Sequence, residues 1–362
     1  MHNLDYKKRI GIFGASGYAG IELTRILGQH PGVELAFATS DRWEGRLVTE
    51  MVGAAGQASS LIYASNQQGQ KLASQCDLVL LATPNEVSLD WVPGLVKSGV
   101  RIIDLSGSFR LKNASLYPRF YGFPHSELPL LERAVYGLPE LFREDISSAH
   151  LIANPGCYAT AATLALAPLL KDHLIESEAI VIDAASGVTG AGRKASEDFN
   201  FVEVEGNYSA YAVLKHRHAP EIRQTLTRHS GEDVRLTFIP HLLPIGRGIL
   251  ATCYARARPN VRLADLEQSI GEFCRNAPFV KLIGRSEKVH LKNVVGTNLC
   301  ILGIDFNDFG SAGSEDDPGR VVIVSALDNL VKGAAGQAVQ NLNLALGFEE
   351  SEGLLSLRGT HP

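Results

Sequence analysis

Cys157 stands in the segment NPGCYAT, directly after Pro155 and Gly156 and directly before a run rich in alanine and leucine. Proline and glycine interrupt regular structure, and the residues that follow are strong helix formers. The apolar residues 151–153 are typical of a short strand. We therefore predict that Cys157 lies at a strand-to-helix turn, where backbone N–H groups and the helix dipole lower a thiol pKa below its free value of about 8.5. Such a thiol is a nucleophile; an ordinary buried cysteine is the alternative.

Two histidines, His216 and His218, follow in the segment LKHRHAPEI, just before a predicted helix start at Pro220. Covalent catalysis by a cysteine needs a general base close to the thiol. Residues two apart in an extended segment point the same way, so both imidazoles can face one cleft. A His-x-His metal site is the alternative. The spacing supplies no third ligand, so we predict no metal.

Gly14, Gly17 and Gly20 form a G-x-x-G-x-x-G pattern between an apolar strand at 10–13 and a helical pattern that ends near Gly28. A second strand at 33–38 completes a βαβ unit, in which such glycines let a diphosphate approach the helix N-terminus. The pattern matches the common G-x-G-x-x-G fingerprint only in part. Because strand, turn, helix and strand occur in the required order, we predict a nucleotide-binding site.

The second strand of this unit ends in ATSDRW, with Ser40 and Arg42 on either side of Asp41. Enzymes that use NAD usually carry an acidic residue here, which accepts from the ribose 2′-hydroxyl. A hydroxyl and a guanidinium suit a 2′-phosphate instead. We therefore predict NADP(H), although Asp41 argues in the other direction.

Strands and helices alternate through the first half, with strands predicted at 76–84 and 100–110 around a helix at 86–98. This alternation predicts an α/β fold with a doubly wound parallel sheet. Ligands gather at the carboxyl ends of such strands, where Ser106 and Arg110 follow the strand at 100–110. A capping serine and a solvated arginine are the alternative interpretation of these two residues.

The second half of the chain contains further strand patterns. A strand at 178–186 leads into a glycine-rich loop at 186–193, and residues 234–257 form two strands around a Pro/Gly turn that carries Arg247. At this turn Arg247 is a candidate for binding an anionic substrate. Further strands are predicted at 279–283, 298–306 and 320–327, and a helix at 328–348 begins with Asp328 or Asn329 as its N-cap.

The composition excludes several classes of protein. A chain of 362 residues with 45% hydrophobic and 20% charged residues is typical of a folded protein of about two domains. A net charge of −5 without a Lys/Arg cluster argues against nucleic acid, and no apolar run reaches the roughly 20 residues that span a membrane. Five scattered cysteines and no signal-peptide pattern predict a reduced, cytoplasmic enzyme.

Six segments occur in order between about residue 8 and residue 348: GASGYAGIEL, NPGCYAT, SGVTGAGR, HRHAPEI, PHLLPIGRGI and DNLVKGAAGQAVQNLN. Together they resemble the N-acetyl-gamma-glutamyl-phosphate reductases, a family of the arginine pathway within the aspartate-semialdehyde-dehydrogenase superfamily. The resemblance implies reduction of an acyl phosphate by NADPH to a semialdehyde, through a thioester. It also implies a Rossmann-type domain at 1–155 completed by the helix at 328–348, and a mixed-sheet catalytic domain at 156–327. A homo-oligomer, either a dimer or a tetramer, is expected, and the tail at 349–362 is expected to be poorly ordered.

The resemblance also implies roles for individual residues. Cys157 is the nucleophile, and the two histidines of HRHAPEI supply the acid/base. Of these we favour His218, which directly precedes Ala-Pro-Glu-Ile, in which case His216 contacts the substrate. The dinucleotide contacts are Gly14, Ala15, Ser16, Gly17 and Tyr18 at the diphosphate, Ser40 and Arg42 at the 2′-phosphate, and Ser186, Gly187 and Asn329 at the nicotinamide end. The substrate contacts are Ser106, Arg110, Asn154 and Arg247.

Three other functions fit parts of the sequence. A sister reductase would act on a carrier-linked or aminoadipyl phosphate, and a basic docking surface for an acidic carrier would indicate it; 34 basic against 39 acidic residues give no such sign. A cysteine hydrolase would also use a reactive thiol, but it needs no dinucleotide turn, so the first 40 residues argue against this class. A nucleotide-binding redox sensor would combine the glycine turn and the thiol without catalysis.

Overall fold

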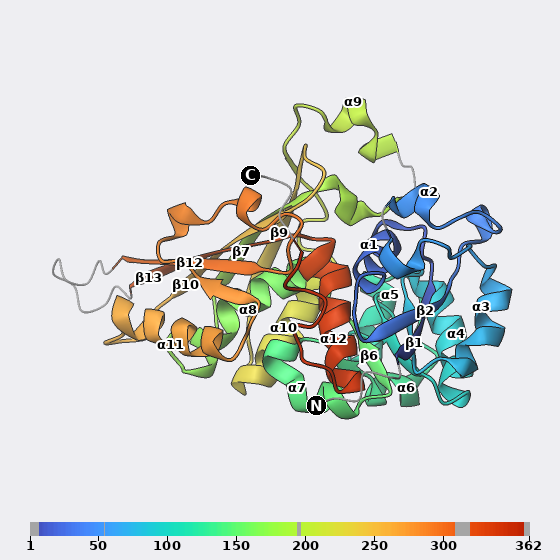
Figure 1. Cartoon of the computed structure of the whole chain (residues 1–362). Helices are drawn as coiled ribbons and strands as arrows, with labels where there is room; N and C mark the ends of the chain where they lie inside the picture. Colours follow the sequence, from blue (N-terminus) through green and yellow to red (C-terminus); the bar gives the residue numbers. More distant parts are fainter. Residues whose placement is uncertain (1–6, 54, 194–196, 308–318, 358–362) are drawn as a thin grey trace. The chain divides into compact units, whose positions relative to one another are not determined.

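The protein is described here from a computed structural model, which describes residues 7–53, 55–193, 197–307 and 319–357. The chain forms two compact units. Unit 1 contains the described part of Met1–Gly156 together with Ala334–Leu357, and unit 2 contains that of Cys157–Gly333. Figure 1 shows the chain coloured along the sequence.

Unit 1 is built on a six-stranded parallel sheet in the order β2-β1-β3-β4-β6-β5. Its strands are β1 (Lys8–Phe13), β2 (Val33–Ala38), β3 (Leu78–Leu81), β4 (Arg101–Asp104), β5 (Val135–Tyr136) and β6 (Leu151–Ala153). Its helices are α1 (Tyr18–Leu27), α2 (Thr49–Val52), α3 (Asn66–Leu72), α4 (Asn85–Lys97), α5 (Tyr117–Phe120), α6 (Leu128–Arg133), α7 (Pro139–Ser148) and α12 (Gly336–Leu346). All four residues of β3 are buried, as expected for a strand covered on both faces. The predicted doubly wound sheet is confirmed.

The strand predicted at 100–110 is wrong in length, because β4 ends at Asp104. Beyond it the chain turns inward, with the side chains of Asp104 and Ser106 hydrogen-bonded to each other at 2.7 Å. Gly107 then passes directly beneath an aromatic ring, since a β-carbon there would lie 2.0 Å from the ring of Tyr121. Packing and side-chain hydrogen bonds thus replace the extended conformation that the residue types favour.

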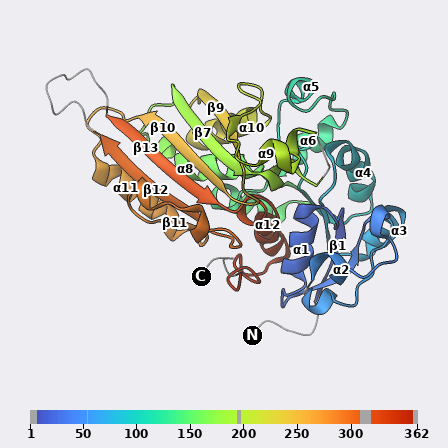
Figure 2. The ribbon, with the colours of Figure 1, turned by 90° about the horizontal axis from the view of Figure 1, so that it is seen from above.

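Unit 2 contains a seven-stranded mixed sheet in the order β11-β12-β13-β10-β7-β9-β8. Its strands are β7 (Ile180–Gly187), β8 (Ser209–Ala210), β9 (Leu236–Leu243), β10 (Ile249–Arg256), β11 (Val280–Leu282), β12 (Cys300–Asn307) and β13 (Arg320–Leu327). Its helices are α8 (Cys157–Lys171), α9 (Phe201–Val204), α10 (His218–Ser230) and α11 (Leu263–Arg275). Helix α8 packs against β10 and β13, and Ser325 donates to the carbonyl of Ala161 at 2.9 Å. Figure 2 shows β12, β13, β10 and β7 side by side.

The C-terminal region differs from the expectation in two ways. The predicted helix at 328–348 is a π-helical turn at Val331–Ala335 followed by α12. The tail was expected to be poorly ordered, yet its described part is packed in unit 1, with Leu354 only 2% exposed. Asn343 of α12 donates to the carbonyl of Glu350 at 3.0 Å, and Gln340 donates to the Glu350 carboxylate at 2.8 Å. Residues 358–362 lie outside the described residues.

Candidate active site

Cys157 is the first residue of α8, and the loop Asn154–Gly156 connects it to the end of β6. The predicted strand-to-helix turn is therefore confirmed. The thiol-bearing residue is partly exposed. Its backbone lies close to the π-helical turn, because a β-carbon on Gly333 would lie 2.6 Å from Cβ of Cys157. Only glycine fits at position 333 without moving the residue that carries the thiol.

Tyr158, the residue bonded to Cys157, packs against both predicted imidazoles. Its ring centroid lies 5.6 Å from that of His216 and 5.9 Å from that of His218. The two imidazole centroids are 4.8 Å apart, and Phe238 of β9 contacts both Tyr158 and His216. Unit 2 thus brings the predicted nucleophile and both predicted histidines to the adjoining ends of α8 and α10.

The two histidines differ in their hydrogen bonding. Nδ1 of His216 accepts from the backbone N–H of His218 at 3.2 Å. An imidazole that accepts at Nδ1 carries its proton on Nε2 in the neutral form. Burial, with a smaller contribution from the charge of Arg217, lowers the pKa of His216 to about 4. At neutral pH His216 is therefore a hydrogen-bond donor through Nε2.

A pair of tyrosine hydroxyls, which the sequence reasoning missed, adjoins the thiol. Tyr211 donates to the hydroxyl oxygen of Tyr158 at 3.3 Å, and Tyr158 donates to the carbonyl of His241 at 3.0 Å. Burial raises the pKa of Tyr211 to about 12, and the charge of a Cys157 thiolate contributes to that increase. The aromatic residue beside the cysteine in NPGCYAT was the only available signal.

The backbone between Tyr211 and His216 is strained. Ala212 and Leu214 have φ angles of 43° and 59°, a region that residues with a β-carbon seldom adopt. Left-handed residues of this kind cost roughly 1 kcal/mol or more each and concentrate at functional sites. The surrounding structure therefore holds Tyr211 and His216 in place at an energetic cost.

Asn329, predicted at the nicotinamide end, joins two loops of unit 2. Its Oδ1 accepts from the backbone N–H of Gly248 at 2.8 Å, and its Nδ2 donates to Oγ1 of Thr189 at 2.9 Å. Ser186 and Gly187 end β7, and a β-carbon on Gly187 would lie 2.8 Å from the backbone of Arg247. The three predicted residues thus occupy one cluster at the end of β7.

Arg247, predicted to bind substrate, forms an ion pair with Asp328, which is fully buried. Nε of Arg247 lies 3.1 Å from Oδ2 of Asp328, and Nη2 donates to Oδ1 at 3.2 Å. The carboxylate also accepts from the backbone N–H groups of Gly296, Leu330 and Val331 at 2.7, 2.8 and 3.1 Å. Asp328 therefore caps the turn that leads to α12, as predicted. Substrate binding by Arg247 stays a prediction.

The other three predicted substrate residues lie in unit 1, at the ends of β4 and β6. Arg110 is buried and donates to the carbonyls of Asn154 and Leu105 at 2.8 Å each. Asn154 is also buried and donates to the carbonyl of Ala334 at 3.2 Å. Ser106 binds the buried Asp104, whose pKa is raised chiefly by burial. These side chains have structural partners, and their binding of substrate stays a prediction.

The predicted diphosphate turn has the conformation that its glycines allow. Gly14 has φ +71°, and a β-carbon there would lie 2.4 Å from the carbonyl oxygen of Ala82. Gly20 passes equally close to Gly14, since its β-carbon would lie 2.3 Å from the Gly14 oxygen. Ala15 is buried, and Gly17 is the N-cap of α1, which begins at Tyr18 without a capping side chain or an acidic residue in its first turn. The helix start is suited to an anion.

Ser16 and Ser40, predicted from different motifs, are in contact, with their hydroxyl oxygens 2.8 Å apart. Arg42 is exposed on a 3₁₀ turn, and no hydrogen bond or ion pair engages its side chain within the described ranges. Asp41 is engaged instead: its two carboxylate oxygens accept from the backbone and side-chain nitrogens of Asn66 at 2.8 and 2.7 Å. The first turn and the end of β2 thus form one polar cluster.

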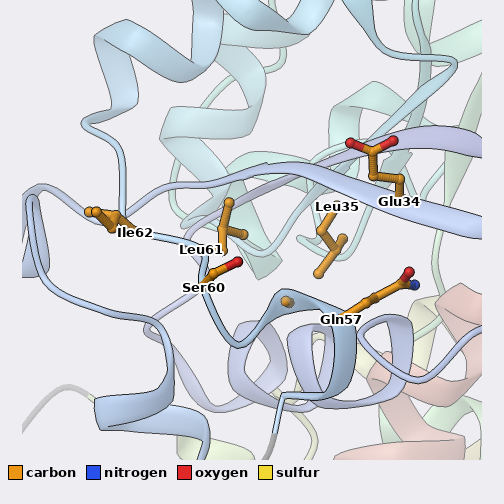
Figure 3. A pocket seen from close by; sticks show the side chains of 7 residues that line it. Glu34, Leu35, Gln57, Ser60, Leu61 and Ile62 are labelled. Atoms are coloured by element: carbon orange, nitrogen blue, oxygen red, sulfur yellow. The ribbon is translucent and has the colours of Figure 1, made fainter.

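A cavity of about 450 Å³ lies elsewhere in unit 1, beside the edge strand β2 (Figure 3). Its lining residues are Glu34, Leu35, Gln57, Ala58, Ser60, Leu61 and Ile62. None of them belongs to the predicted site. The described parts of the chain contain no helix long and apolar enough to cross a membrane, and no group of three or more His, Cys, Asp or Glu side chains arranged to hold a metal ion.

Comparison with known proteins places both units in one class. Residues 9–149 match the family profile of the semialdehyde dehydrogenase NAD binding domain, and residues 157–329 match that of the semialdehyde dehydrogenase dimerisation domain. Aspartate semialdehyde dehydrogenase II from Vibrio cholerae has a similar fold, with a TM-score of 0.72 and 18% identity over 95% of this chain and 99% of that one. A Candida albicans aspartate semialdehyde dehydrogenase, solved with NADP, gives a TM-score of 0.66 at 14% identity, covering 94% and 99% of the two chains.

Sequence relatives narrow the class. The chain is 43% identical over 354 residues to an N-acetyl-gamma-glutamyl-phosphate reductase of Crocosphaera subtropica, covering 97% of each chain. It is 44% identical to the enzyme of that name from Synechocystis, covering 97% and 98%. The chain therefore belongs to the N-acetyl-gamma-glutamyl-phosphate reductase family, as its sequence segments indicated.

Proposed function

We propose that this protein reduces N-acetyl-L-glutamyl 5-phosphate to N-acetyl-L-glutamate 5-semialdehyde, with NADPH as the reductant and release of phosphate. The names of its relatives, at 40 to 44% identity, identify the substrate. The observation that carries the chemistry is the packing of both imidazoles on Tyr158, directly beside Cys157 at the start of α8.

The first step is acyl transfer to sulfur. The Cys157 thiolate attacks the carbonyl carbon of the acyl phosphate, and the bond to the phosphate oxygen breaks to leave a thioester. The oxyanion formed in between is stabilised by N–H groups at the start of α8, each well-placed donor contributing about 3 kcal/mol. His218 takes the thiol proton and returns it to the departing phosphate.

The second step is reduction of the thioester. NADPH, when bound, would supply the hydride for the thioester carbon. The resulting thiohemiacetal anion collapses, its C–S bond breaks, and the aldehyde leaves Cys157 as the thiolate. His216 donates from Nε2 to an oxygen of the bound substrate, a role that suits an imidazole that is neutral at pH 7.

The residues of unit 1 fit a phosphorylated dinucleotide. The uncapped start of α1 suits the diphosphate, held by Gly14, Ala15, Ser16, Gly17 and Tyr18. Ser40 and the exposed Arg42 suit the 2′-phosphate. In unit 2, Ser186, Gly187 and Asn329 contact the nicotinamide end and Arg247 binds the substrate. In unit 1, Ser106, Arg110 and Asn154 bind the substrate or support the residues that do.

The protein acts as a homo-oligomer in the cytoplasm. Residues 157–329 match a dimerisation domain, and alternate residues on one face of β10, among them Leu250, Thr252 and Tyr254, are not buried. A second copy covering this face would produce a dimer or a tetramer. All five cysteines are free, which suits a reducing compartment.

The reverse reaction tests the proposal. Phosphate-dependent reduction of NADP⁺ by N-acetylglutamate semialdehyde is expected for the wild type, and a loss of at least about 1,000-fold in kcat is expected for Cys157→Ser. Cys274→Ser is the matched control and keeps full activity. A wild type without turnover, or a Cys157→Ser variant with normal turnover, would refute the proposal. Aminoadipate semialdehyde, tested alongside, reports the substrate preference.

A further inference from the structure

The contact between Asp41 and Asn66 bears on the choice between NADP and NAD. Asp41 lies between Ser40 and Arg42, at the end of β2, where an acidic residue would favour NAD. A free carboxylate there would repel a 2′-phosphate and compete with it for Arg42. In this structure both carboxylate oxygens are bound by Asn66, at 2.8 and 2.7 Å.

Asn66 is itself fixed from the opposite side. Its Oδ1 accepts from Oγ1 of Thr39 at 2.7 Å, and Oγ1 of Thr39 accepts from the backbone N–H of Gly14 at 3.2 Å. This hydrogen-bond chain determines which end of the Asn66 amide faces Asp41, because only the NH₂ group can donate to the carboxylate. It also connects Asn66 to the first glycine of the diphosphate turn.

The neighbouring arginines show the consequence. Arg46 pairs with Glu50, and its guanidinium lies 4.2 Å from the centre of the Trp43 ring. Arg42 is exposed, and none of the described residues engages its side chain through a hydrogen bond or ion pair. Asp41 is the adjacent acid that would pair with it, but Asn66 holds that carboxylate.

We propose that Asn66 is a specificity-determining residue, which retains the Asp41 carboxylate and thereby leaves Ser40 and Arg42 to a 2′-phosphorylated nucleotide. The inference rests on the proposed use of NADPH. Asn66 acts by positioning the Asp41 carboxylate, whose negative charge would otherwise repel the 2′-phosphate.

Nucleotide binding without turnover tests this inference. The full-length protein is titrated by calorimetry with adenosine 2′,5′-bisphosphate and, separately, with 5′-AMP. Asn66→Asp keeps an oxygen acceptor for Thr39 but places a second carboxylate against Asp41. We expect its affinity for the bisphosphate to fall by about tenfold or more, and its affinity for 5′-AMP to change by less than about threefold.

A second substitution distinguishes charge from structural damage. In Asn66→Asp combined with Asp41→Asn, the affinity for the bisphosphate should return to within about threefold of wild type. Gln67→Ala, at the exposed neighbouring position on α3, is the control and should change neither affinity. Thermal unfolding of every variant reports whether it is folded.

The outcomes are distinguishable. If Asn66→Asp binds both nucleotides as the wild type does, or if the double variant does not recover, the role of Asn66 is refuted while the proposed reaction stands. If the wild type itself does not prefer the bisphosphate over 5′-AMP, the proposed use of NADPH fails, and the inference fails with it.

Discussion

His216 and His218 are joined by a hydrogen bond in which the backbone N–H of His218 donates to Nδ1 of His216 at 3.2 Å. The bond satisfies the backbone N–H of the first residue of α10 and fixes the neutral tautomer of His216. Protonation of Nδ1 would break the bond. The two imidazoles lie two residues apart and pack together, but they differ in their hydrogen bonds. The acid/base role of His218 stays a prediction.

This bond predicts an acid sensitivity of the fold. The pKa of His216 is lowered to about 4, mainly by burial, from 6.5, so between these values the unfolded chain binds the proton more readily. The contribution of His216 to the free energy of unfolding is complete above about pH 6.5 and is lost as the pH falls toward 4. At pH 5 the loss amounts to about 1–2 kcal/mol. Urea unfolding of the wild type and of His216→Asn at pH 7 and pH 5 measures it. The variant should lose less stability on acidification; equal losses would contradict the prediction.

The Arg247–Asp328 pair predicts a coupled loss of stability. Asp328 is fully buried, and removing either partner leaves the other charge uncompensated, at a cost of about 2 kcal/mol or more in the free energy of unfolding. Arg247→Met combined with Asp328→Asn should cost less than the sum of the two single changes by at least about 1 kcal/mol. Additive losses in chemical unfolding would show that the pair is not coupled.

A rise in KM for Arg247→Met beyond that for Asp328→Asn would support substrate binding by Arg247.

Gly333→Ala predicts an effect on the thiol. The new β-carbon would lie 2.6 Å from Cβ of Cys157, so the start of α8 or the π-helical turn must move. A displacement of about 1 Å in a catalytic group can cost roughly 100-fold in rate. The rate of Cys157 alkylation by iodoacetamide, measured without substrate, should change together with kcat. Gly271→Ala, in the middle of α11 with open space around it, is the control and should be neutral or stabilising.

The packed tail predicts a difference between two adjacent leucines. Leu354 is 2% exposed and Leu355 is 74% exposed. Leu354→Ala should lower the free energy of unfolding of unit 1 by about 2–4 kcal/mol, whereas Leu355→Ala should stay within about 0.5 kcal/mol of wild type. Unfolding followed by fluorescence compares them. A loss for Leu354→Ala no larger than that for Leu355→Ala would contradict the prediction.

The sequence is sufficient to predict a structural feature where that feature depends on residues close together in the chain. The βαβ unit around Gly14 and the place of Cys157 at the first turn of α8 follow from motifs a few residues long. Strand ends were predicted poorly, as at Asp104, because the chain turns there to meet Tyr121.

Features that depend on long-range pairing were not predictable. Asp41 meets Asn66 across 25 residues, and Arg247 meets Asp328 across 81. Tyr211 reaches Tyr158 from a segment 53 residues away. Which of these distant residues come into contact depends on the order of strands in the sheet and on loop packing. Neither can be inferred from the residue types alone. The prediction for the tail is wrong for the same reason, because the described part of the tail is hydrogen-bonded to α12.

The contact between Cys157 and Gly333 has a consequence for how the gene could be cut and rejoined. These residues begin and end the continuous stretch that forms unit 2, so this piece of chain enters and leaves at one point. The flanking segments of unit 1 are also in contact, because the Asn154 side chain donates to the carbonyl of Ala334 at 3.2 Å. Unit 2 is thus an insertion with abutting ends. Joining Gly156 directly to Ala334 should yield unit 1 as one separately expressible polypeptide. Permuting unit 2 through a short loop should yield unit 2 as another.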